Sequence, residues 1–498
     1  MKHIKTLSLF MVLIGTVACN DFLEETPKSF IAPQNFYKTE GDALASMYSI
    51  YDALGSGNGV YYRWYRDLTL MLSDEGYGPT NNSLFWTLNT YTHDGRNTMI
   101  TQLWQFTYAA IDRANATIDN VTEMTINQQL KDQIIGEAKF LRALNYFNLV
   151  RLYGPVPLSL EETKSVNGLE RPTSSIEDIY KAILDDLIEA EKYVPVRKRG
   201  SAAANGLADL GAVKMLLAKV YMTMAGYPLN DAAKWPLALE KAKELYTSRA
   251  DYGFGLWSNY LDAFEPKNEN GKEDIFSIQF KAGFGAPFVG EGSLQHIDVF
   301  QGIKGRRGNY LNRPSEKLFL SFNSTDKRLL ALPNFRIVLG DTTYFADTSK
   351  DRIFYKFVEQ DVVDKNSAPN DTEKNFPVYR YSDLLLMLAE AENEVNGPAA
   401  AYPYLKEVTD RAGVPEATGL SKDEMRTFLM DERMRELHNE GSRWFDMVRQ
   451  QMIMEEVAEA STINSVQIPG IPQEHHYFLP YPVDELAVND QISQRPGY

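Results

Sequence analysis

The stretch Glu137-Ala-Lys-Phe-Leu-Arg-Ala-Leu-Asn-Tyr-Phe147, continued by Leu149-Val-Arg-Leu-Tyr-Gly-Pro-Val-Pro157, decides the fold of this chain. Its apolar residues recur at helical spacing and predict a helix from about Gln128 to Tyr153, which the following Gly-Pro-Val-Pro ends because proline cannot continue a helix. The helix is apolar on two faces, one carrying Ile134, Ala138 and Leu141 and the other Phe140, Leu144 and Phe147. Such a helix packs between neighbours on both sides, as in stacked helical hairpins.

The same periodicity recurs on both sides of this helix and predicts a mostly α-helical protein of paired helices similar to tetratricopeptide repeats. Ser174 or Ser175 is the expected cap of the next helix along the chain. The stripes that carry this prediction are Trp104, Tyr108, Ile111 and Ile118; Ile179, Ile183 and Leu187; Val213, Leu216, Leu217, Val220 and Met224; Leu384, Leu388, Ala391 and Val395. A final helix pair is expected over about 422–439 and 442–456.

Between about Asp251 and Tyr379 the composition changes, because Gly, Asn and Pro become frequent. Short runs with β propensity, 275–280 and 354–358, interrupt this segment and predict short strands in a loop-rich insertion. A second loop-rich patch covers 74–98. We therefore divide the chain into a signal segment (1–18), a first helical region (19–250), the insertion (251–379) and a second helical region (380–498).

The N-terminus has the layout of an export signal. Lys2 and Lys5 precede an apolar run over 7–17, and Cys19, the one cysteine of the chain, follows Ala18. This is the arrangement of a lipoprotein cleavage site, at which the cysteine is acylated and its fatty chains become the membrane anchor. The alternative is an ordinary secretory signal with an incidental cysteine.

Composition and motifs exclude several classes of function. The net charge of −16 over 498 residues disfavours nucleic acid as a partner, because a polyanion would be repelled. No zinc-protease pair, serine elbow, P-loop or dinucleotide fingerprint is present, and we expect no metal and no cofactor. Composition leaves a glycoside hydrolase open, because that chemistry needs only two of the 67 carboxylates.

Five segments of the chain form a combined signature. They are Cys19-Asn-Asp-Phe-Leu-Glu-Glu-Thr-Pro27, the stretch 137–157 quoted above, Arg380-Tyr-Ser-Asp-Leu-Leu-Leu-Met-Leu-Ala-Glu-Ala-Glu392, the set Glu432-Arg433, Glu436-Leu437, Glu440-Gly441 and Arg443-Trp-Phe-Asp446, and the tail from Phe478-Leu-Pro-Tyr-Pro482 to Gln494-Arg-Pro-Gly-Tyr498. In this order they resemble the SusD family of surface glycan-binding lipoproteins of Bacteroidetes. In the C-terminal set, the simplest interpretation of Arg443, Trp444 and Asp446 is a core tryptophan beside a satisfied ion pair.

The resemblance implies a tetratricopeptide-like fold, a place on the outer-membrane surface through a lipid anchor, and no catalysis. It also implies a partner, a SusC-like TonB-dependent transporter that the protein serves as a lid or capture subunit. The expected ligand is an oligosaccharide or polysaccharide, and capture of a peptide by a lid of the same family is the alternative.

Sugars bind through aromatic faces and through polar side chains that meet their hydroxyls. The segment Asn81-Asn-Ser-Leu-Phe-Trp-Thr-Leu-Asn-Thr-Tyr91 offers Trp86, Asn89 and Tyr91, and Asp74 precedes it. The alternative is that this segment is a small hydrophobic anchor for its loop. A second candidate patch, in Gly-rich surroundings, contains Phe284, Phe288, His296 and Tyr310.

Overall fold

The computed structural model describes residues 36–57, 59–62, 64–165, 169–202, 205–280, 312–332, 336–339, 342–345, 352, 354–357, 374–463 and 470–498. The fold is mostly α-helical, with a few short strands, as the periodicity predicts. The longer helices are α2 (Glu40–Gly55), α5 (Thr98–Glu123), α6 (Gln128–Tyr153), α7 (Ile176–Tyr193), α8 (Leu210–Ala225), α9 (Lys234–Thr247), α13 (Tyr381–Asn396), α14 (Pro398–Ala412), α15 (Lys422–Leu437) and α17 (Ile453–Ile463).

Shorter elements connect the long helices. The short helices are α3 (Trp64–Met71), α4 (Ser83–Asn89), α10 (Arg249–Tyr252), α12 (Glu316–Leu320), α16 (Arg443–Arg449) and α18 (Val483–Val488), with 3₁₀ turns η2 (Tyr260–Phe264), η3 (Pro266–Asn268), η5 (Lys327–Ala331) and η7 (Glu474–Tyr477). The strands are β1 (Gly76–Tyr77), β2 (Asp274–Ile278), β3 (Arg313–Pro314), β4 (Arg336–Leu339), β5 (Thr342–Phe345) and β6 (Phe376–Arg380). They pair as the antiparallel two-stranded units β1–β3, β2–β6 and β4–β5.

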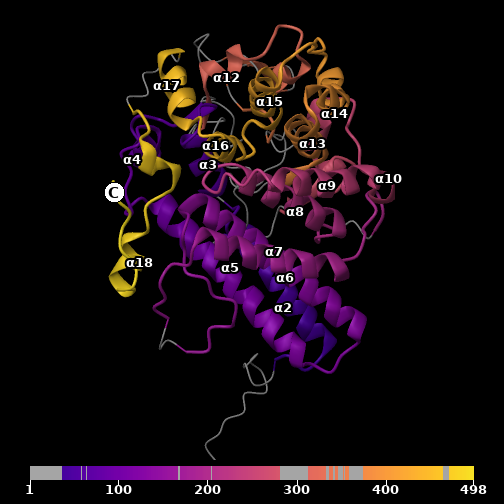
Figure 1. Ribbon diagram of the computed structural model, residues 1–498, viewed down its shortest axis with the longest axis vertical. Helices are drawn as coiled ribbons and strands as arrows, with labels where there is room; N and C mark the ends of the chain where they lie inside the picture. The colour runs from indigo at the N-terminus through magenta and orange to yellow at the C-terminus, as the bar shows by residue number, and fades with distance from the viewer. Residues whose placement is uncertain are drawn as a thin grey trace, which may run out of the picture.

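The long helices stack as hairpins. Consecutive helices α5, α6 and α7 pack on one another, and α8 packs on α9 and α13 on α14. In Figure 1, α2, α5, α6 and α7 occupy the lower part of the molecule, and α13, α14 and α15 the upper part. The main cluster of buried side chains runs from Ile50 to Ile492, so both parts share one core.

Helix α6 is the centre of the lower part, and it confirms the predicted bounds. Every residue from Phe140 to Tyr153 is buried, because the helix has neighbours on both sides. Asn127 caps its first turn through the Leu130 amide, and it ends at Gly154, whose φ of 62° suits glycine. Ser175 is the cap of the next helix, α7, and accepts from the Asp178 amide.

Two expectations about short segments need correction. Of the 354–358 run, residues 354–357 form no strand: Phe354 and Tyr355 are irregular, Lys356 and Phe357 form a turn, and Val358 lies outside the described residues. The patch 74–98 is not a loop throughout, since it contains β1 and the helix α4. The 275–280 run is confirmed as strand β2 over its first four residues.

A buried ion-pair network joins α15 to the upper core. Glu436 on α15 accepts from Arg411 of α14 at 2.5 Å, and from Arg328 and Arg380 at 3.2 Å. Burial alone would raise the pKa of Glu436, but these guanidinium groups hold it far below its usual range. The network fixes the junction between the C-terminal helices and the segments before them. Within the residues described here, no helix is long and apolar enough to cross a membrane.

Candidate functional site

The first predicted site lies on and around helix α4. Asn82 caps this helix by accepting from the Leu84 amide, and the Phe85 and Leu88 side chains enter the main core. The Asn97 side chain also holds the first turn of α4, because it donates a hydrogen bond to the Leu84 carbonyl at 3.0 Å. The cap and the apolar spacing explain why this polar-looking stretch forms a helix.

Trp86 is the member of this set that remains at the surface. Its side chain is half-buried, and it is not among the described hydrophobic side chains that pack in or against the core. Its neighbours in sequence, Ser83 and Asn81, are exposed. A partly exposed indole beside polar groups can offer one face of its ring to a sugar.

Asp74 is engaged inside the protein. Both of its carboxylate oxygens accept from the Arg443 guanidinium at 2.7 Å, and the Lys317 ammonium lies 3.2 Å away. Only 2% of the residue is exposed. Burial alone would raise its pKa, but Arg443 and Lys317 hold the pKa of Asp74 below its usual range. This arrangement ties the start of the 74–98 segment to α16.

Asn89 and Tyr91 are also held by internal contacts. The Asn89 side chain accepts from the Gly78 amide at 2.7 Å and donates to the Met71 carbonyl at 2.8 Å. The Tyr91 hydroxyl donates to the Leu72 carbonyl at 2.7 Å, and burial raises the pKa of that hydroxyl well above its ordinary value. Both residues are buried. They position α4 against α3, so Trp86 alone of the four predicted residues has its side chain partly at the surface.

A cluster of histidine and tyrosine rings backs this segment. The ring of Tyr91 lies 5.1 Å from that of His476, and His476 lies 5.4 Å from His93. Tyr498 packs on both histidines at 5.7 and 5.8 Å. Burial, followed by repulsion from neighbouring imidazoles, lowers the pKa of His93 to about 3 and that of His476 to about 4. The C-terminal tail is therefore packed against the Trp86 segment through neutral rings.

The second predicted patch and the anchor lie outside the described residues. Phe284, Phe288, His296 and Tyr310 fall within 281–311, and Cys19 falls within 1–35. Within the described part of the chain, no group of three or more His, Cys, Asp or Glu side chains could hold a metal ion.

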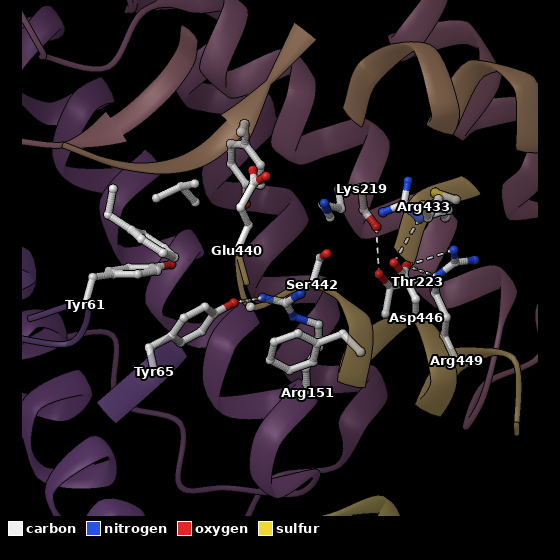
Figure 2. Close-up of a pocket in the computed structure, with 16 residues that line it drawn as sticks. Tyr61, Tyr65, Arg151, Lys219, Thr223, Arg433, Glu440, Ser442, Asp446 and Arg449 are labelled. Carbon is white, nitrogen blue, oxygen red and sulfur yellow. Dashed lines mark hydrogen bonds and ion pairs between the residues drawn. The ribbon is translucent and has the colours of Figure 1, made fainter. Parts of the chain in front are cut away.

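Figure 2 shows an interior polar cavity, where Arg151 of α6 lies between Tyr65 of α3 and the helix α16. The Arg151 guanidinium lies 3.9 Å above the Phe445 ring. Elsewhere in the lining of this cavity, Asp446 forms an ion pair with Arg433 at 2.8 Å. The cavity volume is about 30 Å³, which suits one or two water molecules and excludes a pyranose ring.

The C-terminal signature has a structural role, as its simplest interpretation predicts. Trp444 is fully buried, Asp446 pairs with Arg433 and Arg449, and Arg443 pairs with Asp74. These residues hold helices together and lie away from the surface. Because the side chains of this signature are buried and paired with one another, the signature identifies the fold, and the ligand site must lie at other positions.

The comparisons with known proteins agree with this fold. Residues 343–498 match the SusD family, and residues 21–222 match a related family described as "Starch-binding associating with outer membrane". A SusD-like protein of Formosa agariphila is 28% identical and aligns with 98% of this chain and 97% of its own.

Solved structures extend the match to three dimensions. The structure of a SusD homologue from Bacteroides thetaiotaomicron superposes with a TM-score of 0.81, at 23% identity, over 93% of this chain and 98% of that one. A laminarin-binding SusD-like protein superposes with a TM-score of 0.75, at 25% identity, over 93% of this chain and all of the other.

The fold and the matches define a helical binding protein of the bacterial outer membrane. The chain belongs to the SusD family. Proteins of this family bind their ligands and do not transform them, so this chain is a binding protein and not an enzyme.

Proposed function

We propose that this protein is a cell-surface lipoprotein that captures an oligosaccharide or polysaccharide and delivers it to a SusC-like TonB-dependent transporter. Family membership supports the class of ligand, because one matching family is described as starch-binding and one similar structure as laminarin-binding. The observation that carries the site is Trp86, a half-buried indole on a firmly held helix.

The rigidity of α4 supports this assignment. Asn89 and Tyr91 fix the end of the helix, and Asn97 fixes its first turn, so the Trp86 backbone is held before any ligand arrives. Preorganisation of this kind lowers the entropy lost on binding. A sugar ring stacked on the indole would leave its hydroxyls to the polar groups nearby, of which Asn81 and Ser83 are exposed.

The anchor and the partner complete the proposal. Acylation of Cys19 would hold the protein at the membrane, and the 20 residues 20–39 separate the anchor from α2, the first helix of the described part of the chain. A lid on a transporter needs a stable contact, on the order of 2,000 Å² of buried surface or more. The helical hairpins supply broad, rigid faces for such a contact.

The test of this function is a binding panel together with a co-purification. Mature protein is run in affinity gels that contain laminarin, soluble starch, xylan, pectin or alginate, and we expect retardation by at least one of them without any new reducing ends. Protein tagged at its C-terminus should co-purify with a large outer-membrane barrel from mildly solubilised membranes. Failure to bind any glycan of the panel would contradict the ligand class, and recovery as a lone protein would contradict the partner.

A further inference from the structure

A second hollow lies between α5, the segment after α6, and α18. We call this segment, residues 157–165 and 169–171, the strap; it leaves the lower part of the molecule as an open loop below α18 in Figure 1. The hollow has a volume of about 500 Å³, within the range of small-molecule sites. It is far larger than the cavity of Figure 2, and none of the predicted site residues lines it.

The first half of the strap is pinned to the helices beneath it. The Asn115 side chain donates to the carbonyls of Ser159 at 3.1 Å and Glu161 at 3.0 Å. The Arg142 guanidinium donates to the Leu160 carbonyl at 2.9 Å. Asn115 is itself buried. These bonds hold one wall of the hollow in place without help from a ligand.

The second half of the strap is pinned to the C-terminal tail. Asn489, which is 3% exposed, donates to the Arg171 carbonyl at 3.0 Å, and the Gln491 side chain donates to the Glu170 carbonyl at 2.9 Å. Asn489 also donates to the Glu485 carboxylate at 3.0 Å. These contacts fix the opposite wall of the hollow through the backbone carbonyls of the strap.

The lining combines aromatic rings with balanced charge. Tyr108, half-buried, and Trp104 form an aromatic pair with ring centroids 4.9 Å apart at the floor. Four charged side chains surround them: Glu162, Lys164, Arg171 and Glu485. Their formal charges cancel, so the hollow offers no net attraction to a phosphate or a polyanion.

Two of these charged groups are available for a ligand. Within the described residues, the Arg171 guanidinium makes no hydrogen bond or ion pair. The Lys164 ammonium makes a loose ion pair with Glu162 at 3.8 Å, beyond hydrogen-bond distance, and its side chain is largely exposed, so a ligand can compete for it. A hydroxyl both donates and accepts, so a ring bearing several hydroxyls can meet cations and carboxylates at once. A saccharide fits this mixture better than an ion of either sign.

We propose that this hollow is a second saccharide site, which takes one pyranose unit of a glycan chain. The inference rests on the proposed function, because it assumes that the protein meets glycans. The hollow is also linked to the Trp86 segment, since the Val483 amide at the start of α18 donates to the Gly95 carbonyl at 3.0 Å. Helices α4 and α18 lie on the same flank of the molecule (Figure 1). Two sites on one flank would bind a long chain more tightly than either site alone.

The test removes the two available cations. Lys164 and Arg171 are exposed, so the double variant K164A/R171A should fold normally. The matched control, K181A/K406A, removes two exposed lysines from α7 and α14 and changes the net charge equally. Both doubles are made in the wild-type chain and in W86A. The probes are the polysaccharide of the panel that binds best and its trisaccharide, for example laminarin with laminaritriose or starch with maltotriose.

We expect K164A/R171A to weaken binding of the polysaccharide roughly tenfold and to leave the trisaccharide at the Trp86 site unaffected. In the W86A background, weak residual binding of the polysaccharide should disappear with K164A/R171A and persist with K181A/K406A. If K164A/R171A matches its control in both backgrounds, the second site is refuted while the proposed function stands. If the wild-type chain binds no glycan of the panel, both fall together.

Discussion

The buried pair between Asp74 and Arg443 yields a sharp prediction, because it decides between two roles for a predicted site residue. Asp74→Asn keeps the shape of the side chain and removes its charge. Arg443, which is 1% exposed, then keeps only Glu456 as a carboxylate partner, at 2.8 Å. Lys317 loses Asp74 as well and keeps Glu456 and Glu459. Removing one member of a buried pair costs about 3–5 kcal/mol where the other charge is left without compensation. Because Glu456 still compensates Arg443 in part, we expect the lower end of that range, about 3 kcal/mol.

That cost converts into a measurable melting shift. At about 2 cal/mol/K per residue, a chain of this length has an unfolding entropy on the order of 1 kcal/mol/K. The melting temperature of D74N should therefore fall by about 3 °C. Asp185→Asn is the matched control, because Asp185 pairs with Lys181 on the exposed face of α7, with 62% of its side chain accessible. An exposed pair of this kind contributes less than about 0.5 kcal/mol, so D185N should melt like the wild type.

The assay pairs calorimetric melting with glycan binding at a temperature well below the transition. Because the pKa of Asp74 is held below its usual range, its stabilising charge is present above about pH 3.8 and is lost as the pH falls further, so the gap between D74N and wild type should narrow in acid. D74N should bind the glycan normally. A variant that melts like the wild type but has lost binding would refute the structural role and return Asp74 to the ligand site.

Three further predictions concern titration and the anchor. The pKa of His93 is lowered to about 3 in the folded protein, so the wild type loses free energy of unfolding as the pH falls below about 6.5, where the imidazole becomes charged in the unfolded chain. H93Q lacks this titration. Between pH 7 and 5 its free energy of unfolding, measured by urea denaturation, should fall by up to about 2 kcal/mol less than that of the wild type. Glu75 gives the opposite pH dependence, because burial and the charge of Asp74 raise its pKa to about 8, so the wild type loses free energy of unfolding as the pH rises above about 4.5. The free energy of unfolding of E75Q should therefore rise by up to about 3 kcal/mol relative to the wild type between pH 4.5 and 7. A difference between the two proteins that does not change with pH would contradict this. Cys19→Ala should abolish acylation and move the protein from the membrane fraction to the soluble one, and retention in the membrane would disprove the anchor.

The helices could be predicted from the sequence because their signals are local. The bounds of α6 follow from apolar spacing and from the Gly-Pro stop, and the cap of α7 follows from a serine before an apolar stripe. The interpretation of Trp444 as a core residue also held, because a large apolar side chain at helical spacing is most often buried.

The site could be predicted only in part, because its decisive contacts are distant in sequence. Asp74 reads as a ligand-binding carboxylate until its partner is known, and that partner lies 369 positions away. Asn89 likewise reads as a polar surface residue, although its amide is committed to backbone groups on both sides. The hollow at the strap has no linear signature, since it joins α5, the strap and α18. Trp104 and Tyr108 could be assigned to a helix stripe but not to a site.

The measurement that tests the central claim most directly is a calorimetric titration of wild type, W86A and W257A with the glycan identified by the panel. Trp257 is the control, because it is also half-buried but the Lys272 ammonium lies 4.6 Å from the centre of its ring. Loss of stacking on Trp86 should cost about 1–3 kcal/mol, or roughly 5- to 150-fold in affinity. We predict that W86A binds the glycan more weakly by this factor while its melting temperature stays almost unchanged, and that W257A binds like the wild type. Equal affinity of W86A and wild type would contradict the assignment of Trp86 to the glycan site.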